Sequence, residues 1–395
     1  MTERDIFFQN LGLPSRNPLA IKIVKADGIY IFDEKNQPIV DLCSGVSVSN
    51  IGHNHPKVVQ AVVEQAQKYM HLHVYGEIIQ SPQVQFAKLI TSILPLNLDT
   101  VYFVNSGSEA TEGAIKLAKR YTGRYEIASF KKAYHGSTIG ALSVLGDDYW
   151  KQSFLPLMPC VNFLEFNNHQ DLLKITEQTA AVIVEPIQAE AGVVLPQNDF
   201  LKKLRQRCNQ TGTLLIFDEV QTGFGRTGKL FAMEHYDVVP DIITFAKAMG
   251  GGMPIGAFVS SHKIMEAFQF APELGHITTF GGHPVSAAAG LAALDFLLNS
   301  SIIEEVKEKE NIFRKNLTNS KIKSINGIGL LLAVELQDPN TVNKFLNLAV
   351  NNGLLTDAFL FAPNKFRIAP PLTISNNQIE QVCQKINLIL EKLKK

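Results

Sequence analysis

Between about residues 85 and 290, short apolar runs alternate with segments whose apolar residues recur at helical spacing. The runs have the length of buried strands. Such alternation predicts a mostly parallel sheet with helices on both faces, because parallel strands need crossover connections that pack on the sheet. The expected strands are 101–104, 127–130, 180–185, 214–218, 242–245 and 257–260, and the expected helices are 109–121, 198–210 and 284–299.

The two ends of the chain do not follow this alternation. Residues 22–42 predict a small hairpin, and residues 57–70 predict an amphipathic helix. After residue 290, helical segments surround a strand at 329–336, which is typical of a smaller α+β domain. A chain of 395 residues is long enough for two domains. The expected division is 1–50 as an N-terminal segment that contributes to the small domain, 51–290 as the large domain, and 291–395 as the C-terminal small domain.

Composition excludes several classes of protein. Hydrophobic residues make up 46% of the chain and charged residues 19%, which is typical of a globular rather than a disordered protein. The 37 basic residues balance the 37 acidic ones, so neither nucleic acid nor a membrane is an expected partner. The four cysteines form no Cys-x-x-Cys pair, which argues against zinc and a disulfide framework. The N-terminus lacks the apolar stretch of a signal peptide, and this predicts a cytoplasmic location.

Two neighbouring apolar runs end in a residue that can carry chemistry. The run 214–218 ends in Asp218, and the run 241–247 ends in Lys247. Ligands of open α/β sheets bind at the carboxyl ends of the strands. An amine and a carboxylate at that edge indicate a site for pyridoxal 5'-phosphate (PLP). The lysine is expected to form the Schiff base, and the aspartate to keep the pyridine nitrogen protonated.

The segment 101–109 indicates where the phosphate binds. It is a strand followed by a tight turn and a helix start, for which we expect Ser108 as the N-cap residue. The first N–H groups of such a helix are free to bind an anion. Gly107 allows close approach, and the hydroxyl groups of Ser106 and Ser108 add donors. An ordinary capped helix shows the same pattern, so the phosphate interpretation depends on the two strand ends above.

Further motifs occur in a fixed order along nearly the whole chain. They are Asn105-Ser-Gly-Ser-Glu-Ala, Tyr134-His-Gly, Val184-Glu-Pro-Ile-Gln188, Phe217-Asp-Glu-Val-Gln-Thr-Gly-Phe-Gly-Arg-Thr-Gly228, Ala246-Lys-Ala, Thr278-Thr-Phe-Gly-Gly282 and Arg367-Ile-Ala-Pro-Pro371. With these motifs the chain resembles the class III aminotransferases, which are PLP enzymes of fold type I. The subgroup that it resembles most is that of the acetylornithine and ornithine aminotransferases.

The resemblance implies an α/β fold in which helices sandwich a mostly parallel sheet, with PLP in the large domain and a small α+β domain from both chain ends. It implies that Lys247 is the Schiff-base lysine and proton shuttle, and that Asp218 pairs with the pyridinium nitrogen. The other implied cofactor contacts are Ser106, Gly107 and Ser108 at the phosphate, Tyr134 and Val220 on the two ring faces, Gln221 near the 3'-oxygen, Glu185, and Thr279 at the phosphate of the neighbouring subunit. Thr279 therefore implies a homodimer with active sites at the subunit interface.

The resemblance also implies the residues that bind the substrate. Arg367 matches an arginine that binds a substrate carboxylate, a task that suits its planar bidentate donor. Glu190 matches a glutamate that pairs with this arginine in ornithine-type enzymes. That switch lets one site accept an amine-terminated donor in one half-reaction and 2-oxoglutarate in the other. Ser137 stands where many relatives carry an arginine, and it cannot bind a second carboxylate, which leaves the donor open.

The expected function is ping-pong transfer of an amino group from a small-molecule donor to an oxo acid, 2-oxoglutarate. The expected donor is an ω-amine such as ornithine, N-acetylornithine, lysine or a related amino acid. Two alternatives remain open: an aminomutase or decarboxylase on the same fold, and a non-catalytic protein that retains the fold. We expect no metal site, and we interpret His53, His55 and His135 as structural or loop histidines.

Overall fold

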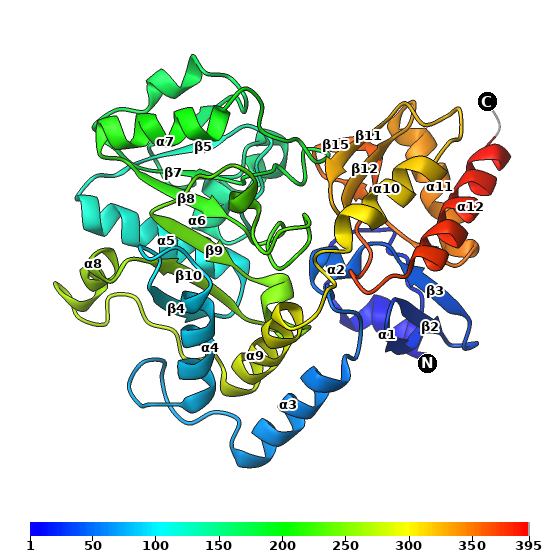
Figure 1. Ribbon diagram of the computed structural model, residues 1–395, viewed down its shortest axis with the longest axis horizontal. Coiled ribbons are helices and arrows are strands. Elements are labelled where there is room, and N and C mark those ends of the chain that lie inside the picture. The colour runs from blue at the N-terminus through cyan, green and yellow to red at the C-terminus, as the bar shows by residue number, and fades with distance from the viewer. Residues whose placement is uncertain (394–395) are drawn as a thin grey trace.

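A seven-stranded sheet forms the centre of the larger part of the molecule, as the computed structural model of residues 1–393 shows (Figure 1). Its strand order is β4-β10-β9-β8-β7-β5-β6. The pairs among β5 to β9 are parallel, whereas β10 is antiparallel to β4 and β9. The predicted mostly parallel sheet is confirmed, and β6 is an additional strand. The strands are β4 (Thr100–Val104), β5 (Glu126–Phe130), β6 (Val161–Leu164), β7 (Thr179–Val184), β8 (Leu214–Asp218), β9 (Ile242–Phe245) and β10 (Gly256–Ser260).

Both faces of this sheet are buried, which explains why its strands are continuous apolar runs. In β8, Leu215 belongs to the hydrophobic cluster on one face and Ile216 to the cluster on the other. Helix α5 packs closely on the second face, because a Cβ atom at Gly113 would lie only 2.2 Å from a ring carbon of Phe258. The helices of this part are α3 (Pro56–Lys68), α4 (Ser81–Ser92), α5 (Gly107–Thr122), α6 (Ile139–Ser143), α7 (Phe200–Thr211), α8 (His262–Met265) and α9 (Pro284–Leu298).

The smaller part combines two four-stranded sheets, and both ends of the chain contribute to it. In Figure 1 the blue N-terminal strands lie beside the orange and red C-terminal elements. The first sheet is β1-β2-β3-β13, in which the C-terminal β13 pairs in parallel with β3, and the second is β11-β12-β15-β14. The strands are β1 (Ile23–Asp27), β2 (Tyr30–Asp33), β3 (Pro38–Asp41), β11 (Ser324–Ile328), β12 (Leu331–Glu335), β13 (Leu354–Leu355), β14 (Ala358–Phe359) and β15 (Ala362–Ile368). The helices are α1 (Glu3–Asn10), α2 (Ser44–Ser47), α10 (Val306–Asn316), α11 (Pro339–Asn351) and α12 (Asn376–Lys392).

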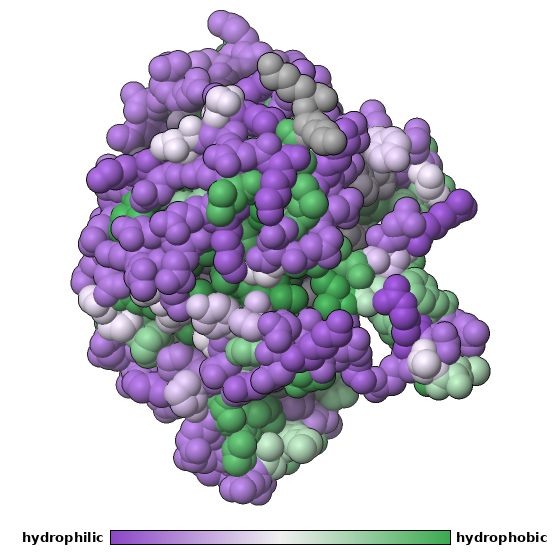
Figure 2. Space-filling model, turned by 90° about the vertical axis from the view of Figure 1, so that its right-hand side faces the viewer, coloured by the Kyte–Doolittle hydropathy of each residue, from purple (hydrophilic) through white to green (hydrophobic). Residues whose placement is uncertain are grey.

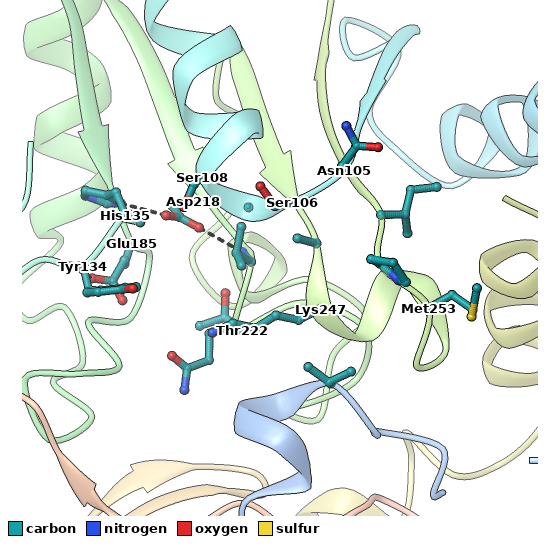
Figure 3. A pocket seen from close by; sticks show the side chains of 18 of the residues that line it. Asn105, Ser106, Ser108, Tyr134, His135, Glu185, Asp218, Thr222, Lys247 and Met253 are labelled. Carbon is teal, nitrogen blue, oxygen red and sulfur yellow. Dashed lines mark hydrogen bonds and ion pairs between the residues drawn. The ribbon is translucent and has the colours of Figure 1, made fainter. Parts of the chain in front are cut away.

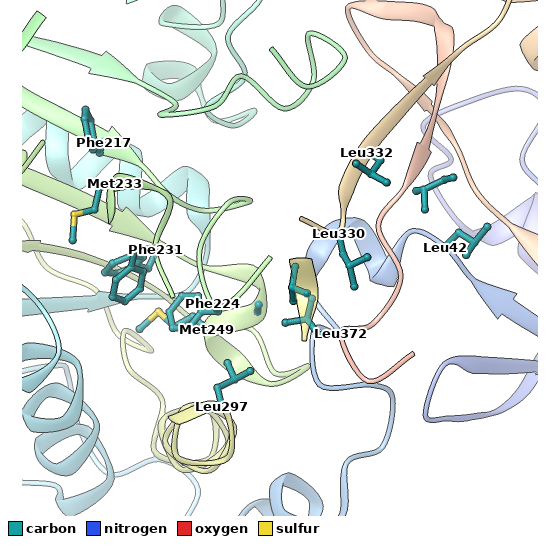
Figure 4. Close-up of a cluster of buried hydrophobic side chains, with 14 of the residues drawn as sticks. Leu42, Phe217, Phe224, Phe231, Met233, Met249, Leu297, Leu330, Leu332 and Leu372 are labelled. Atoms are coloured by element: carbon teal, nitrogen blue, oxygen red, sulfur yellow. The ribbon is translucent and has the colours of Figure 1, made fainter. Parts of the chain in front are cut away.

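A buried arginine joins the two parts. Arg226, on the loop after β8, is fully buried. Its Nη1 donates to the carbonyl oxygens of Leu330 (2.9 Å) and Pro370 (2.6 Å), and its Nη2 donates to the side chain of Asn50. Figure 4 shows the apolar cluster that continues across the same junction, from Phe224 on one side to Leu330 on the other. The loop after β8 is therefore fixed against both chain ends.

The start of α5 differs from the expectation. The N-cap residue is Ser106, whose Oγ accepts a hydrogen bond from the N–H of Glu109 at 3.2 Å. The prediction of Ser108 as the N-cap is therefore wrong, because the helix already begins at Gly107. This places the hydroxyl of Ser108 within the first turn.

Hydrophilic residues dominate the face of the smaller part that Figure 2 shows, with hydrophobic side chains scattered between them. Within residues 1–393, none of the helices has the length and hydropathy that crossing a membrane requires.

Candidate active site

A cavity of about 400 Å³ lies at the carboxyl ends of β8 and β9 (Figure 3). Its size is within the range of small-molecule sites. Most of the residues predicted to bind the cofactor line it. They are Ser106, Gly107, Ser108, Tyr134, Glu185, Asp218, Val220, Gln221 and Lys247. The sequence segments that carry these residues are far apart, and the sheet brings them together at one edge.

Lys247 lies two residues after the end of β9. Its backbone has φ +52°, which is the left-handed region that non-glycine residues rarely adopt, and it opens a short 3-10 helix (Lys247–Gly250). Burial lowers the pKa of its amine, although the charge of Glu190 opposes this shift. A lysine with a lowered pKa is uncharged at a lower pH than usual, and only the uncharged amine is a nucleophile.

Asp218 is the last residue of β8 and is buried. Its Oδ1 accepts a hydrogen bond from the N–H of Val220 at 3.0 Å, and its Oδ2 lies 2.7 Å from Nδ1 of His135 (Figure 3). His135, interpreted from the sequence as a structural or loop histidine, is thus buried and supports Asp218. Since an ionised carboxylate only accepts, Nδ1 is the donor of this pair. No local pattern predicts this contact, apart from the position of His135 beside Tyr134.

The turn before α5 forms a cradle with little free space. A Cβ atom at Gly107 would lie 3.0 Å from a methyl group of Val220, and one at Gly136 would lie 2.3 Å from Oγ of Ser108. The N–H groups of the first turn of α5 have no helical acceptor, and the helix dipole favours an anion there. Within the described chain, the buried Nε2 atoms of Gln221 and His135 also lack hydrogen-bond partners. A phosphorylated pyridine fits this donor set.

Glu185 fixes the position of Tyr134. Its carboxylate accepts hydrogen bonds from the N–H groups of Tyr134 (3.0 Å) and Ala189 (2.9 Å). Burial raises the pKa of Glu185 to about 7, and the charge of Asp218 adds to this shift. The hydroxyl of Tyr134 lies 3.1 Å from Oγ of Ser137, which is exposed at the edge of the cavity. Glu185 thus fixes the backbone of Tyr134, and Ser137 contacts the hydroxyl at the outer end of its side chain.

Arg367 and Glu190 form a buried ion pair outside the cavity lining. Nη2 of Arg367 lies 2.9 Å from Oε1 of Glu190, and Nε lies 2.8 Å from Oδ1 of Asp357. Burial opposes the charge of Arg367, but the two carboxylates outweigh it and raise its pKa. Burial likewise opposes the charge of Glu190, but Arg367 and Lys247 outweigh it and lower the pKa of that carboxyl. No sequence motif indicates a role for Asp357, which lies in the connection between β13 and β14.

Thr279 is the one predicted cofactor residue that this arrangement leaves away from the cavity lining within residues 1–393. It is exposed, and its neighbour Thr278 contacts the side chain of Asn105, which does line the cavity. The structure thus places Thr279 on the surface next to a segment that borders the cavity.

The comparisons with known proteins identify the family of the chain. The family model for class-III aminotransferases matches residues 13–390, and the chain belongs to this family, whose cofactor is PLP. It is 36% identical to the acetylornithine aminotransferase of Methanopyrus kandleri, over 91% of this chain and 92% of that protein. It is 38% identical to a [LysW]-aminoadipate semialdehyde/glutamate semialdehyde transaminase of Sulfurisphaera tokodaii, over 82% and 83% of the two chains. A solved ornithine aminotransferase from Toxoplasma gondii, with PLP at partial occupancy in its active site, superposes with a TM-score of 0.87 at 29% identity and covers 99% of this chain and 94% of its own.

Glu219 supports the loop that follows Asp218. It is fully buried and accepts hydrogen bonds from the N–H groups of Ala232 (3.0 Å) and Met233 (2.7 Å), and from the hydroxyl of Thr222. Burial raises the pKa of Glu219 from 4.5 to about 7. The folded protein therefore keeps this proton to a higher pH than the unfolded chain does.

This pKa difference predicts a pH-dependent stability. Between pH 4.5 and 7 the folded state binds more protons than the unfolded state, so the free energy of unfolding falls as the pH rises. Glu219 and Glu185 share this direction, and each shift corresponds to on the order of 3 kcal/mol. We expect Glu219→Gln to remove roughly half of the loss seen by urea unfolding of the cofactor-free protein between pH 5 and 8. The exposed Glu64→Gln is the matched control, and an unchanged pH slope in Glu219→Gln would contradict the assignment.

Proposed function

We propose that this class III aminotransferase moves an amino group from an ω-amine donor to 2-oxoglutarate in two separate half-reactions, in a ping-pong mechanism. The main support is the meeting of Lys247, Asp218 and the N-terminus of α5 at one cavity. An amine, a carboxylate and an anion cradle are the three contacts that an amine-reactive phosphopyridine needs. Lys247 and Asp218 are the proposed catalytic residues.

PLP, when bound, supplies an electron sink for the carbanion that deprotonation of an amine-bearing carbon produces. Ser106, Gly107 and Ser108 would hold its phosphate. Asp218 would keep a proton on the ring nitrogen, and His135 orients that carboxylate through the 2.7 Å contact. This proton is what allows the ring to accept electrons.

The remaining cofactor contacts orient the ring. Tyr134 and Val220 line the cavity and would pack on the two faces of the ring, and Gln221 would donate to its 3'-oxygen through Nε2, which has no partner among residues 1–393. Glu185 holds the backbone of Tyr134 in place. Lys247 would bind the cofactor through its amine and would act as the base that moves a proton at the amine-bearing carbon of the donor. Its lowered pKa suits this task, because a lysine acts as a base only when its amine is uncharged.

Arg367 and Glu190 determine which substrate enters. With Glu190 paired to Arg367, no cation is offered to a carboxylate, and an amine-terminated donor is preferred. When Glu190 moves aside, Arg367 binds a carboxylate of 2-oxoglutarate. Relatives named for acetylornithine and for [LysW]-aminoadipate semialdehyde support donors with a terminal amine, such as ornithine, N-acetylornithine or lysine.

The central role of Lys247 is tested by its removal. We expect Lys247→Ala to lose its visible absorbance and to slow turnover by at least roughly a thousandfold, because both the covalent bond and the proton transfer are lost. The exposed Lys263→Ala is the control that keeps both. Borohydride reduction followed by peptide mass analysis should locate the cofactor on Lys247. A variant that kept its turnover would overturn the mechanism.

The same preparation separates transamination from the other reactions of this fold. Donor alone should bleach the absorbance once, and only an oxo acid should restore it. Release of carbon dioxide, or rearrangement of the donor without any oxo acid, would instead support a decarboxylase or an aminomutase.

Ser137 is proposed to make the site indifferent to a second carboxylate on the donor. Its neighbour Gly136 lines the cavity, and Ser137 itself carries no charge. We expect Ser137→Arg to raise the preference for N-acetylornithine over cadaverine by roughly 10- to 100-fold, since an arginine adds a charge-assisted bond to the α-carboxylate. Ser137→Gln, which is long but neutral, is the control. Equal kcat/KM ratios in the serine and arginine forms would remove position 137 from the donor site.

We also propose a homodimer in which Thr279 of one subunit reaches the phosphate of the other. The segments around residues 75 and 278 are joined by a hydrogen bond from the N–H of Tyr75 to the carbonyl of Thr278 (3.3 Å), and this surface borders the cavity through Asn105. Large hydrophobic side chains are exposed on both segments, which is typical of an interface. They are Met70, Leu72, Ile78, Ile79, Phe270, Leu274, Ile277 and Phe280.

The dimer is tested at Ile79, which is 93% exposed. A buried, unpaired charge disfavours an interface, so we expect Ile79→Asp to sediment as a monomer and to lose PLP on dilution. Leu96→Asp is the matched control, because Leu96 is 98% exposed and lies outside the two segments. A wild-type protein that is fully active as a monomer would remove both the interface and Thr279 from the proposal.

Two further proposals concern the domain division of the chain and the location of the protein in the cell. We propose a large PLP-binding domain at 51–290 and a small domain from 1–50 and 291–395, which is supported by the parallel pairing of β3 with β13. We propose a cytoplasmic location, supported by four cysteines that are all free in the structure.

A further inference from the structure

Arg367 is held by two carboxylates, which is more than an ion pair needs. Glu190 and Asp357 contact different nitrogens of the guanidinium, Nη2 (2.9 Å) and Nε (2.8 Å) respectively. The guanidinium carbon also lies 4.3 Å from the ring centroid of Phe359, which covers its face. Within residues 1–393, the buried Nη1 has no hydrogen-bond partner. The guanidinium therefore has one carboxylate at Nε, a second at Nη2, and a free donor at Nη1 among the described residues.

The two carboxylates are attached differently. Asp357 is close to Arg367 in the fold itself, because the N–H of Arg367 donates to the carbonyl of Asp357 at 2.9 Å. Glu190 comes from the larger part of the chain, and its Oε2 accepts one further hydrogen bond, from the N–H of Leu360 at 3.2 Å. The backbone bond keeps the segment of Asp357 beside Arg367, and in the proposed function Glu190 is the partner that moves.

The occupied Nε restricts how any other carboxylate can bind. A carboxylate pairs with arginine in bidentate fashion either across Nε and Nη2 or across Nη1 and Nη2. Asp357 occupies Nε, so Glu190 is limited to its single bond with Nη2. When Glu190 leaves, Nη2 and the vacant Nη1 form the only bidentate edge for a substrate.

We propose that Asp357 is a positioning residue that keeps Glu190 displaceable and reserves the Nη1–Nη2 edge for the carboxylate of an oxo acid. This inference rests on the proposed function, in which Arg367 binds that carboxylate. Without Asp357, Glu190 gains access to Nε and Nη2 together and becomes a bidentate partner. A substrate carboxylate then has to displace two bonds instead of one.

The test is calorimetric binding of glutarate to the PLP-loaded protein, because glutarate has the two carboxylates of the acceptor and cannot react. We expect Asp357→Ala to weaken glutarate binding by about tenfold, the equivalent of one charge-assisted hydrogen bond. Asp357→Asn keeps an oxygen acceptor on Nε and should recover most of the affinity. The rate of bleaching by cadaverine, which has no carboxylate, should change less than about threefold.

A double-variant cycle separates positioning from plain support of Arg367. Glu190→Ala alone should tighten glutarate binding, and adding Asp357→Ala in that background should cost less than about threefold, because Glu190 is no longer there to compete. Equal losses in both backgrounds, or no loss in Asp357→Ala, would overturn the role of Asp357. Arg367→Met distinguishes the two levels of the argument: unchanged glutarate binding in that variant would remove the proposed carboxylate site itself.

Discussion

The candidate site depends on the buried guanidinium of Arg226. The residues of the site come from two different parts of the molecule, and Arg226 joins these parts. Lys247 and Asp218 belong to the large sheet, whereas Arg367 lies on β15 of the smaller part. Arg226 donates to the carbonyl of Pro370, three positions after Arg367, and to that of Leu330, just before β12. A buried cation that donates to backbone oxygens tolerates little displacement. Arg226 therefore helps to fix the part that carries Arg367 against the loop that follows Asp218.

The buried glutamates near the site have pKa values that are shifted in opposite directions. Glu185 and Glu219 have raised pKa values because burial dominates, while Glu190 has a lowered pKa because two cations outweigh burial. Glu185, with the raised pKa, accepts the N–H of Tyr134, and Glu190, with the lowered pKa, pairs with Arg367. Whether a cation lies beside a buried glutamate thus decides the direction of its pKa shift.

Much of the fold could be predicted because the sheet is buried on both faces. Continuous apolar runs predict β4, β5, β7, β8, β9 and β10, and Asp218 at the end of β8 and Lys247 after β9 predict the site. The short β6 and β11 are not predicted, since most of their side chains are only partly buried or exposed. The N-cap was placed at Ser108 instead of Ser106, because both serines flank the same glycine. The contacts of His135 and Asp357 were not predictable, since each depends on a partner that the tertiary structure brings near.

Gly136 and Ser137 are adjacent, yet the structure constrains them in opposite ways. Gly136 has φ +130° and no room for a Cβ atom beside Ser108, so no other residue fits there without displacing the anion cradle. Ser137 is exposed, and only its Oγ and N–H make local contacts. The backbone therefore tolerates a different side chain at position 137 but not at position 136. A substitution at 137 would change what the outer end of Tyr134 contacts and leave the packing of Gly136 against Ser108 as it is.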